Sequence, residues 1–348
     1  MASKQKLKGL TGLANLGNTC FMNATLQCLS NTYELNNFLN EKSQDTDNQE
    51  EQKYKKNLHK NPEALVLVEW DTLRQMVWSE NCVISPGGFL ASIQKVARIK
   101  NKTIFTGFAQ NDLPEFLMFC IECFHSAIKR EVNMEISGKV KTKQDKVAIK
   151  CYEMMKKMYK DEYSEMIDFF YGIQISNVKS LKSSYNNMTA EPFLCLNLEI
   201  GSTKTLEGCI DNYTNKEILD DDNMLENDDG EKEPMERKIS FWSLPNNLII
   251  ILKRFNNNNR KNKELIDFPL NNLDLSKYIT GYDKSSYKYD LYGICNHSGG
   301  TMGGHYTSFI KNANNTWYLY NDTRVGPVNN LNKLKSPYAY CFFYRKKK

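Results

Sequence analysis

Apolar residues recur at helical spacing through most of the first half of the chain. After an opening turn, residues 14–39 carry apolar positions three and four apart, a period that predicts helical structure. The same period occurs in PEALVLVEWDTLRQMVW, SPGGFLASIQKVARI and NDLPEFLMFCIECFHSAIK, each with a proline near its start. The polar stretch at 40–61 has no such period and predicts an inserted loop. We therefore expect residues 9–165 to be mainly helical, behind a tail at 1–8.

The second half changes to short runs rich in β-branched and aromatic residues, separated by Asn, Gly and Pro. The runs are FFYGIQISNV, PFLCLNLEI, NNLIIILKRF, YDLYGICNH, HYTSFIKN, WYLYND and AYCFFYRK. Such runs predict the strands of an antiparallel sheet across residues 166–348. The acidic stretch at 217–238 has no hydrophobic face and predicts a second insertion. Helices first and strands afterwards indicate an α+β fold.

Composition and charge exclude several classes of protein. Of the 348 residues 41% are hydrophobic and 25% are charged, which is ordinary for a globular protein with a sizeable core. The net charge of +5 is small for this length and does not call for nucleic acid. No run approaches the about 18 apolar residues of a membrane helix, and the first residues lack the apolar core of a signal peptide. We expect an intracellular protein, cytoplasmic or nuclear, without nucleic-acid or membrane partners.

The ten cysteines lie mostly in apolar runs, where a reduced thiol behaves as a small hydrophobic group. A long chain without a secretory signal is expected to keep them reduced. Metal-like spacing occurs at Cys120 and Cys123, with His125 close behind. That stretch is typical of a buried helix, and no second cysteine pair completes a set of four ligands. We expect no metal there and no cofactor.

Cys20 stands where a turn meets the first predicted helix. Asn15, Gly17 and Asn18 are turn formers, and Thr19 is a suitable N-cap. At a helix start, unpaired backbone N–H groups and the helix dipole favour an anion, so we expect the pKa of a thiol there to be lowered. The alternative is a small apolar residue that merely begins a helix.

His305 is the best candidate for a partner of that thiol. It follows SGGTMGG, whose glycines leave room for an extended substrate. HYTSFIKNANNTWYLYND predicts a hairpin that places position 305 opposite 322, or opposite 321 after a one-residue shift. Asn321 and Asp322 are therefore expected to flank the His305 ring and to orient it, as the third member of a triad does. The alternative is a polar pair that closes a strand.

Acyl transfer also needs donors for the developing oxyanion. The backbone N–H of Cys20 is one candidate. The side-chain amide of Asn15, five residues earlier across the turn, is another, although Asn15 also suits a purely turn-forming role. The residues alone leave these two readings of Asn15 open.

Five segments in the same order resemble the ubiquitin-specific proteases, a family of papain-like deubiquitinating cysteine proteases. GLANLGNTCFMNATLQCLSN is similar to the Cys box of the family, and GGHYTSFIKNANNTWYLYNDTRV is similar to its His box. QNDLPEFL, LPNNLIIILKRF and LIDFPLNNLDLSKY match further family segments between them. The resemblance runs from about residue 9 to residue 345. It implies one catalytic domain over 1–348, with a helical thumb at 9–165 and an antiparallel palm and β fingers at 166–348.

The resemblance also implies the roles of the candidate residues. Cys20 would be the nucleophile that forms a thioester with ubiquitin, and His305 would act as base and then as acid. Asn15 would be an oxyanion donor, Asn321 the third catalytic residue and Asp322 its supporting neighbour. The substrate would be ubiquitin joined through its C-terminal glycine to another protein, and we expect the enzyme to be a monomer.

The C-terminal tail of ubiquitin, Leu-Arg-Leu-Arg-Gly-Gly, calls for carboxylates and for a slot that admits only glycine. Asp112 and Glu115 lie three apart at a predicted helix start and can pair with those arginines, although capping of the helix is an alternative role. Gln110 belongs to the same motif. Residues 302–304, which include Gly303 and Gly304, are expected to form the wall of the glycine channel together with a neighbour, Tyr306.

One departure from the family concerns metal. Many members carry two Cys-x-x-Cys pairs that bind zinc in the fingers, whereas NVKSLKSSYN and the acidic insertion occupy these places here. We therefore expect no zinc in the fingers. Two alternatives to an active deubiquitinase remain, namely a ubiquitin-binding module that has lost turnover and a protease for another ubiquitin-like modifier.

Overall fold

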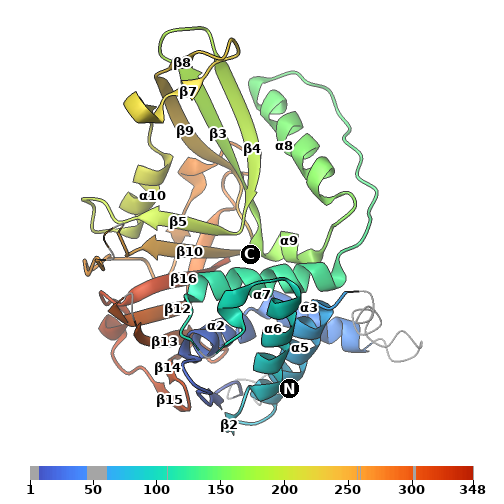
Figure 1. Cartoon of the computed structure of the whole chain (residues 1–348), viewed down its shortest axis with the longest axis vertical. Helices are drawn as coiled ribbons and strands as arrows, with labels where there is room; N and C mark the ends of the chain where they lie inside the picture. The colour runs from blue at the N-terminus through green and yellow to red at the C-terminus, as the bar shows by residue number, and fades with distance from the viewer. Residues whose placement is uncertain are drawn as a thin grey trace.

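The structure is a computed structural model that describes residues 8–44, 61–107, 109–256, 258, 260–300 and 303–347, without the side chains of 41–44. Most of the insertion predicted at 40–61, nearly all of the predicted tail at 1–8 and Met302 lie outside these residues. The fold is α+β, as predicted: a helical body, a large sheet and a smaller sheet that projects from it (Figure 1). In the described ranges no helix is long and apolar enough to cross a membrane.

The helical body, which we call the thumb, is built around one buried helix. Helix α2 (Cys20–Ser30) is buried at all eleven positions, because its apolar residues occupy two faces. It packs between α7 (Leu113–Ile128) and strand β13 (Gly303–Lys311) of the large sheet. The other thumb helices are α3 (Tyr33–Gln44), α5 (Ala64–Ser79) and α6 (Gly87–Ile99), with the turn η2 (Thr103–Phe105) and the two-stranded pair of β1 (Gly12–Leu13) and β2 (Val83–Ile84).

The large sheet, which we call the palm, has the strand order β15-β14-β13-β12-β16-β10-β5. Its strands besides β13 are β5 (Cys195–Glu199), β10 (Asn247–Lys253), β12 (Lys288–Gly300), β14 (Trp317–Asn321), β15 (Arg324–Pro327) and β16 (Ala339–Lys346), and β11 (Leu273–Asp274) pairs with β12. The turns η4 (Ser276–Tyr278) and η5 (Leu331–Leu334) accompany them. The prediction of a purely antiparallel sheet is wrong at one edge, where β5 and β10 are parallel. Parallel neighbours need a long connection, and between these two strands the chain forms a helix and part of the fingers.

The smaller sheet, which we call the fingers, has the order β4-β3-β9-β6. Its strands are β3 (Gly172–Ser180), β4 (Asn186–Phe193), β6 (Glu217–Leu219) and β9 (Met235–Ser243). Helix α8 (Lys143–Tyr159) packs on β4, and α9 (Glu165–Phe170) leads from α8 into the sheet (Figure 1). The acidic stretch at 217–238 is not a plain insertion, because it forms β6, η3 (Asp221–Asn223), β7 (Leu225–Glu226), β8 (Lys232–Glu233) and the start of β9. Helix α10 (Leu206–Thr214) just before it was not predicted.

The tip of the fingers does not offer the ligands of a zinc site. Between β3 and β4, Ser183 Oγ donates to a Glu233 carboxylate oxygen at 2.6 Å. Asn227 closes the neighbouring turn by accepting from the backbone N–H groups of residues 229 and 231. Structural zinc takes thiolate and imidazole ligands, and these side chains supply one carboxylate. Among the described residues no group of three or more His, Cys, Asp or Glu can hold a metal ion, so these residues do not fit zinc.

Candidate active site

Cys20 begins α2, and its side chain is buried, with 3% of the residue exposed. Thr19 is the N-cap residue, as predicted, but its side chain does not cap the helix and instead accepts from the backbone N–H of Leu16 at 2.9 Å. The backbone N–H groups of Tyr306 and Phe21 point at the Cys20 sulfur. Gln110 Nε2 approaches the same sulfur at 4.0 Å. The thiol therefore lies against both the start of α2 and strand β13.

The prediction that the helix start lowers the pKa of Cys20 is wrong for this structure. Burial raises the pKa of this thiol above its ordinary value, and the nearby Asp322 carboxylate raises it further. The backbone N–H groups of Tyr306 and Phe21 act in the opposite direction but are outweighed. Loss of hydration penalises the thiolate more than the helix start favours it. The surroundings of Cys20 therefore favour the neutral thiol over the thiolate.

His305 lies on β13 and is held by Asn321 at the end of β14. His305 Nε2 lies 2.7 Å from Asn321 Oδ1. An amide oxygen can only accept, so Nε2 carries the proton and Nδ1 of the neutral ring keeps its lone pair. In the described part of the chain no hydrogen bond joins His305 to Cys20. The site thus contains a thiol and an oriented imidazole that are not yet bonded to each other.

The register behind this pair differs from the predicted one. Ser308 faces Tyr320 and Lys311 faces Trp317, so the same register would place position 305 opposite 323. The turn is one residue longer than predicted, because the Asn312 N–H donates to the Thr316 carbonyl and Asn315 adopts a positive φ of 61°. The ladder ends at Ser308, and the His305 side chain reaches Asn321 beyond it. Asn321 flanks the ring as predicted, while no hydrogen bond among the described residues links Asp322 to it.

Asp322 instead holds two asparagines near the start of α2. Its Oδ2 accepts from Asn15 Nδ2 at 3.0 Å, and its Oδ1 accepts from Asn23 Nδ2 at 2.8 Å. The other end of the Asn15 amide is also fixed, because Oδ1 accepts from the Thr19 backbone N–H at 3.0 Å. The Asn15 amide is therefore locked in one orientation beside Cys20, with one of its two N–H groups used by Asp322.

Gln110 and Gly304 join the thumb to the palm directly beside Cys20. Gln110 Nε2 donates to the Gly304 carbonyl at 2.6 Å, and the Gly304 N–H donates to Gln110 Oε1 at 2.9 Å. Gly304 has no room for a side chain, because a Cβ there would lie 2.4 Å from His297 Nε2 and 2.4 Å from the Ser298 carbonyl oxygen. The His297 ring and the backbone of β12 therefore pack directly against Gly304.

A cavity of about 410 Å³ opens beside Gln110 and His297. Its lining is contributed by the segment before α7, by the end of β12 and by the start of β13. The lining residues are Ala109, Gln110, Asn111, Asp112, Phe255, His297, Gly300, Gly303 and Tyr306. Gln110, Gly303 and Tyr306, all predicted to contact the substrate tail, are thus brought together around one cavity.

The two predicted tail-binding carboxylates have different surroundings. Asp112 accepts from the Tyr306 hydroxyl at 2.9 Å and from the Tyr340 hydroxyl at 3.1 Å. Loss of hydration raises the pKa of this carboxyl, and the two tyrosine hydroxyls partly offset that effect. Glu115 is exposed in the first turn of α7 and has no hydrogen bond to any described residue. Asp112 is therefore engaged in the cavity wall, while Glu115 is available to a cation.

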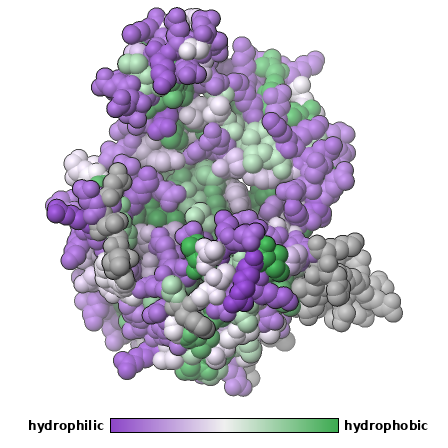
Figure 2. Space-filling view, viewed as in Figure 1, coloured by the Kyte–Doolittle hydropathy of each residue, from purple (hydrophilic) through white to green (hydrophobic). Residues whose placement is uncertain are grey.

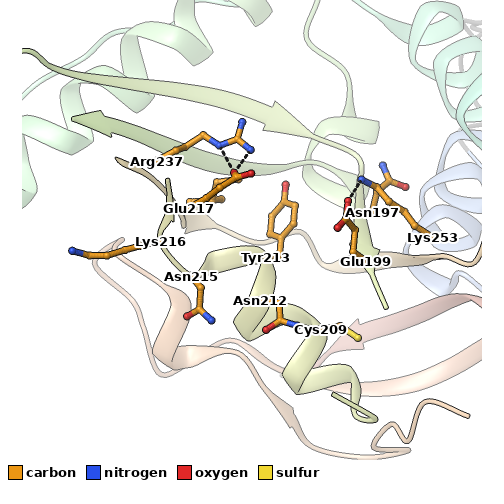
Figure 3. A pocket seen from close by; sticks show the side chains of 11 residues that line it. Asn197, Glu199, Cys209, Asn212, Tyr213, Asn215, Lys216, Glu217, Arg237 and Lys253 are labelled. Atoms are coloured by element: carbon orange, nitrogen blue, oxygen red, sulfur yellow. Dashed lines mark hydrogen bonds and ion pairs between the residues drawn. The ribbon is translucent and has the colours of Figure 1, made fainter. Parts of the chain in front are cut away.

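The surface continues from this cavity toward the fingers. Figure 2 shows a recessed area between the fingers and the lower half of the molecule, with apolar residues inside and polar residues around it. A second cavity in the palm shares Phe255 with the first, and it shares Glu199 and Lys253 with a third cavity of about 310 Å³ below the fingers. In the third cavity Tyr213 stands between the ion pairs Glu217–Arg237 and Glu199–Lys253 (Figure 3). The result is a continuous polar groove.

Some residues of the site were not identified from the sequence. Asn23 was treated as a helix residue and Tyr340 as part of a strand, although they hold Asp322 and Asp112. His297 was placed at the end of a strand and lies within β12, against Gly304. Periodicity gave no signal for the roles of Asn23 and Tyr340, because their partners lie 299 and 228 positions away in the sequence.

A family model described as ubiquitin carboxyl-terminal hydrolase matches residues 11–344. Ubiquitin carboxyl-terminal hydrolase 2 of Homo sapiens is 32% identical over 356 residues, which cover 98% of this chain and 56% of that protein. Ubiquitin carboxyl-terminal hydrolase 21 of Mus musculus is 31% identical over 367 residues, which cover 97% of this chain and 62% of that protein. The chain thus spans little more than half the length of these curated relatives.

Solved structures share the fold. A structure of the yeast SAGA DUBm with an Sgf73 mutant has a TM-score of 0.71 and 25% identity, and covers 99% of this chain and 70% of that one. A SAGA Ubp8 DUB module bound to ubiquitin aldehyde has the same TM-score at 23% identity, and covers 99% of this chain and 71% of that one. The architecture of thumb, palm and fingers is therefore shared across nearly the whole chain.

Proposed function

We propose that this chain, which belongs to the ubiquitin carboxyl-terminal hydrolase family, is a deubiquitinating thiol protease. It would hydrolyse the peptide or isopeptide bond after the C-terminal glycine of ubiquitin. One observation carries the proposal: the Cys20 thiol at the start of α2 lies against strand β13. The same strand carries His305, whose ring is held by Asn321, and it begins beside a cavity of about 410 Å³. Ubiquitinated proteins would be its substrates.

The proposed reaction follows from the thiol of Cys20 and from the tautomer of His305 that Asn321 selects. Cys20 Sγ attacks the carbonyl carbon of the terminal glycine, and the thiol proton passes to Nδ1 of His305. His305 then donates that proton to the departing amine, which leaves a thioester on Cys20. Water attacks the thioester with His305 as base, and the products are free ubiquitin and the restored thiol.

The raised pKa of Cys20 is compatible with this sequence. A buried neutral thiol is a weak nucleophile, and its thiolate becomes accessible when His305 accepts the proton. Asn321 keeps the proton on Nε2 and thereby leaves Nδ1 as the base. The imidazolium formed in this step stays bonded to the Asn321 oxygen. The chain therefore needs no thiolate before the substrate arrives.

Asn15 supports the transition state in this proposal. Its Nδ2 has one N–H bonded to Asp322, and the second is available for the oxyanion together with the Cys20 backbone N–H. Asp322 acts as a positioning residue, because it fixes the orientation of the Asn15 amide and also holds Asn23. Donors held in place before the reaction lose little free energy to reorganisation.

The cavity beside Gly304 fits the tail of ubiquitin. Its wall includes Gly300 and Gly303, which carry no side chains and so leave room for an extended peptide that ends in two glycines. Glu115 is the carboxylate available to a tail arginine, whereas Asp112 shapes the wall through Tyr306. The polar groove that leads to the fingers would hold the globular part of ubiquitin.

The test is hydrolysis of a fluorogenic ubiquitin C-terminal amide by the wild type, by Cys20→Ala and by the control Cys82→Ala, which alters an exposed thiol. We expect Cys20→Ala alone to lose turnover while it still binds ubiquitin. Binding without turnover in the wild type would favour a ubiquitin-binding module. If the wild type neither binds nor cleaves, the same assay with other ubiquitin-like modifiers decides whether one of them is the substrate.

A further inference from the structure

Lys261 makes two contacts to His297 behind the cavity wall. The lysine lies in the segment after β10, where it forms an isolated bridge with Phe255. Lys261 Nζ donates to the His297 carbonyl at 2.6 Å and lies 3.0 Å from Nδ1 of the same residue. An ammonium group can only donate, so Nδ1 must accept. The imidazole is therefore neutral, with its proton on Nε2.

The His297 ring forms part of the wall of the cavity of about 410 Å³ and packs against Gly304. The ring is 3% exposed, and its centroid lies 4.6 Å from that of Tyr306 and 5.7 Å from that of Phe255. Its Nε2 is the atom that a Cβ on Gly304 would meet at 2.4 Å. Movement of the ring would therefore displace the wall directly beside the Gln110–Gly304 pair and Cys20.

The charged groups that act on Lys261 are both positive, namely Arg254 and Lys263. Burial lowers the pKa of Lys261 to about 8, and the neighbouring Arg254 and Lys263 lower it too. Burial lowers the pKa of His297 to about 4, and the Lys261 ammonium acts in the same direction. On the far side of His297 stand Tyr306 and Tyr340, whose hydroxyls bond Asp112. Between these two pKa values an ammonium faces a neutral imidazole.

We propose that Lys261 is a positioning residue for substrate binding: its protonated Nζ fixes the tautomer and plane of His297 and so holds the channel open at the width of a glycine. This role rests on the proposed function, in which the cavity receives the Gly-Gly end of ubiquitin. Lys261 lines the second palm cavity, is not among the described residues that line the cavity of about 410 Å³, and touches none of the reacting atoms. Its effect should therefore appear in KM more than in kcat.

Three variants of the full chain test this role with the fluorogenic ubiquitin amide. Lys261→Met removes the donor, Lys261→Arg keeps a permanent positive donor, and Lys263→Met removes a charge from the same segment without a hydrogen bond to any described residue. At pH 7 we expect Lys261→Met to raise KM about tenfold with kcat within about twofold, as for a lost charge-assisted hydrogen bond. Lys261→Arg should retain most of the wild-type KM, and Lys263→Met should equal the wild type.

The pH profile separates positioning from a merely structural contact. As pH rises through about 8, Lys261 loses its proton and the bond to Nδ1 loses its charge assistance. The wild-type KM should therefore rise toward that of Lys261→Met, while the KM of Lys261→Arg stays nearly level. Identical profiles for the wild type and Lys261→Arg, or a normal KM in Lys261→Met, would overturn the role of Lys261 alone. Absence of both turnover and ubiquitin binding in the wild type would overturn the proposed function together with it.

Discussion

The most direct test of the channel is Gly304→Ala. The added Cβ would lie 2.4 Å from His297 Nε2, 3.1 Å from His297 Cδ2 and 2.4 Å from the Ser298 carbonyl oxygen. Non-bonded heavy atoms settle at about 3.5 Å or more, so the 2.4 Å contacts require a displacement of about 1 Å. Neither neighbour yields easily, because Ser298 belongs to the paired strand β12 and His297 is held by Lys261 and packed on Tyr306.

The size of the effect follows from that displacement. Overpacking of this kind costs about 1–3 kcal/mol of folding stability. A shift of about 1 Å next to the reacting groups lowers kcat/KM by about 100-fold. Strands β12 and β13 both carry site residues. We therefore expect a large loss of kcat/KM even if the melting temperature falls only slightly.

The assay is kcat/KM with the fluorogenic ubiquitin amide, together with thermal unfolding. Gly326→Ala is the matched control, because Gly326 lies in the same sheet and no atom lies within 4 Å of its added Cβ. The control should change stability by no more than about 0.5 kcal/mol. Wild-type kcat/KM in Gly304→Ala would refute the reasoning, since it would mean that the wall beside Gly304 can move without consequence.

Four further outcomes are expected. Asp322→Asn should lower kcat by about tenfold to 100-fold with little change in KM, because it weakens the hold on Asn15; an equal rise in KM would contradict this. Alkylation of Cys20, followed by mass spectrometry, should accelerate with pH to a midpoint above the ordinary value of 9.0, because burial raises the pKa of this thiol; a midpoint below that value would refute the inference. Arg74→Met should lower the free energy of unfolding by about 3–5 kcal/mol in denaturant unfolding, because it leaves the buried Asp71 carboxylate without this partner. The control Lys204→Met, at an exposed ion pair, should change the same free energy by no more than about 1 kcal/mol. A chelator such as EDTA should leave the melting temperature unchanged; a fall would show that the fingers depend on a metal.

The sequence predicted the elements well where local chemistry decides them. The turn at Asn15 to Asn18 and the apolar faces that follow are local features, and α2 begins at Cys20 as they predict. Most of the strand runs also hold, because alternation and β-branched content are properties of single segments. PFLCLNLEI, however, is divided between β4 and β5, and FFYGIQISNV begins within α9. Cys20 at a helix start and His305 on a hairpin could be picked out from the sequence for the same reason, because each lies in a segment with its own local pattern.

The sequence failed where the answer depends on distant segments or on burial. The pKa of Cys20 depends on how deeply the thumb and palm enclose it, and the helix start alone suggested the opposite direction. Asp112 faces Tyr340, 228 positions later in the chain, so no local pattern indicates that its carboxylate is engaged. The register at His305 depended on one additional turn residue, which shifts every pair of the ladder.

The geometry around Cys20 depends on two polar links between thumb and palm, one on each side of the thiol. Gln110 and Gly304 exchange two hydrogen bonds on one side, and Asp322 accepts from Asn15 and Asn23 on the other. Each link fixes a group that the proposed reaction uses, namely the channel wall in the first case and the oxyanion donor in the second. His305 belongs to palm strand β13, and its ring is bonded to Asn321 on the same sheet. The position of the ring relative to the Cys20 thiol is therefore set by the same two links that join palm and thumb.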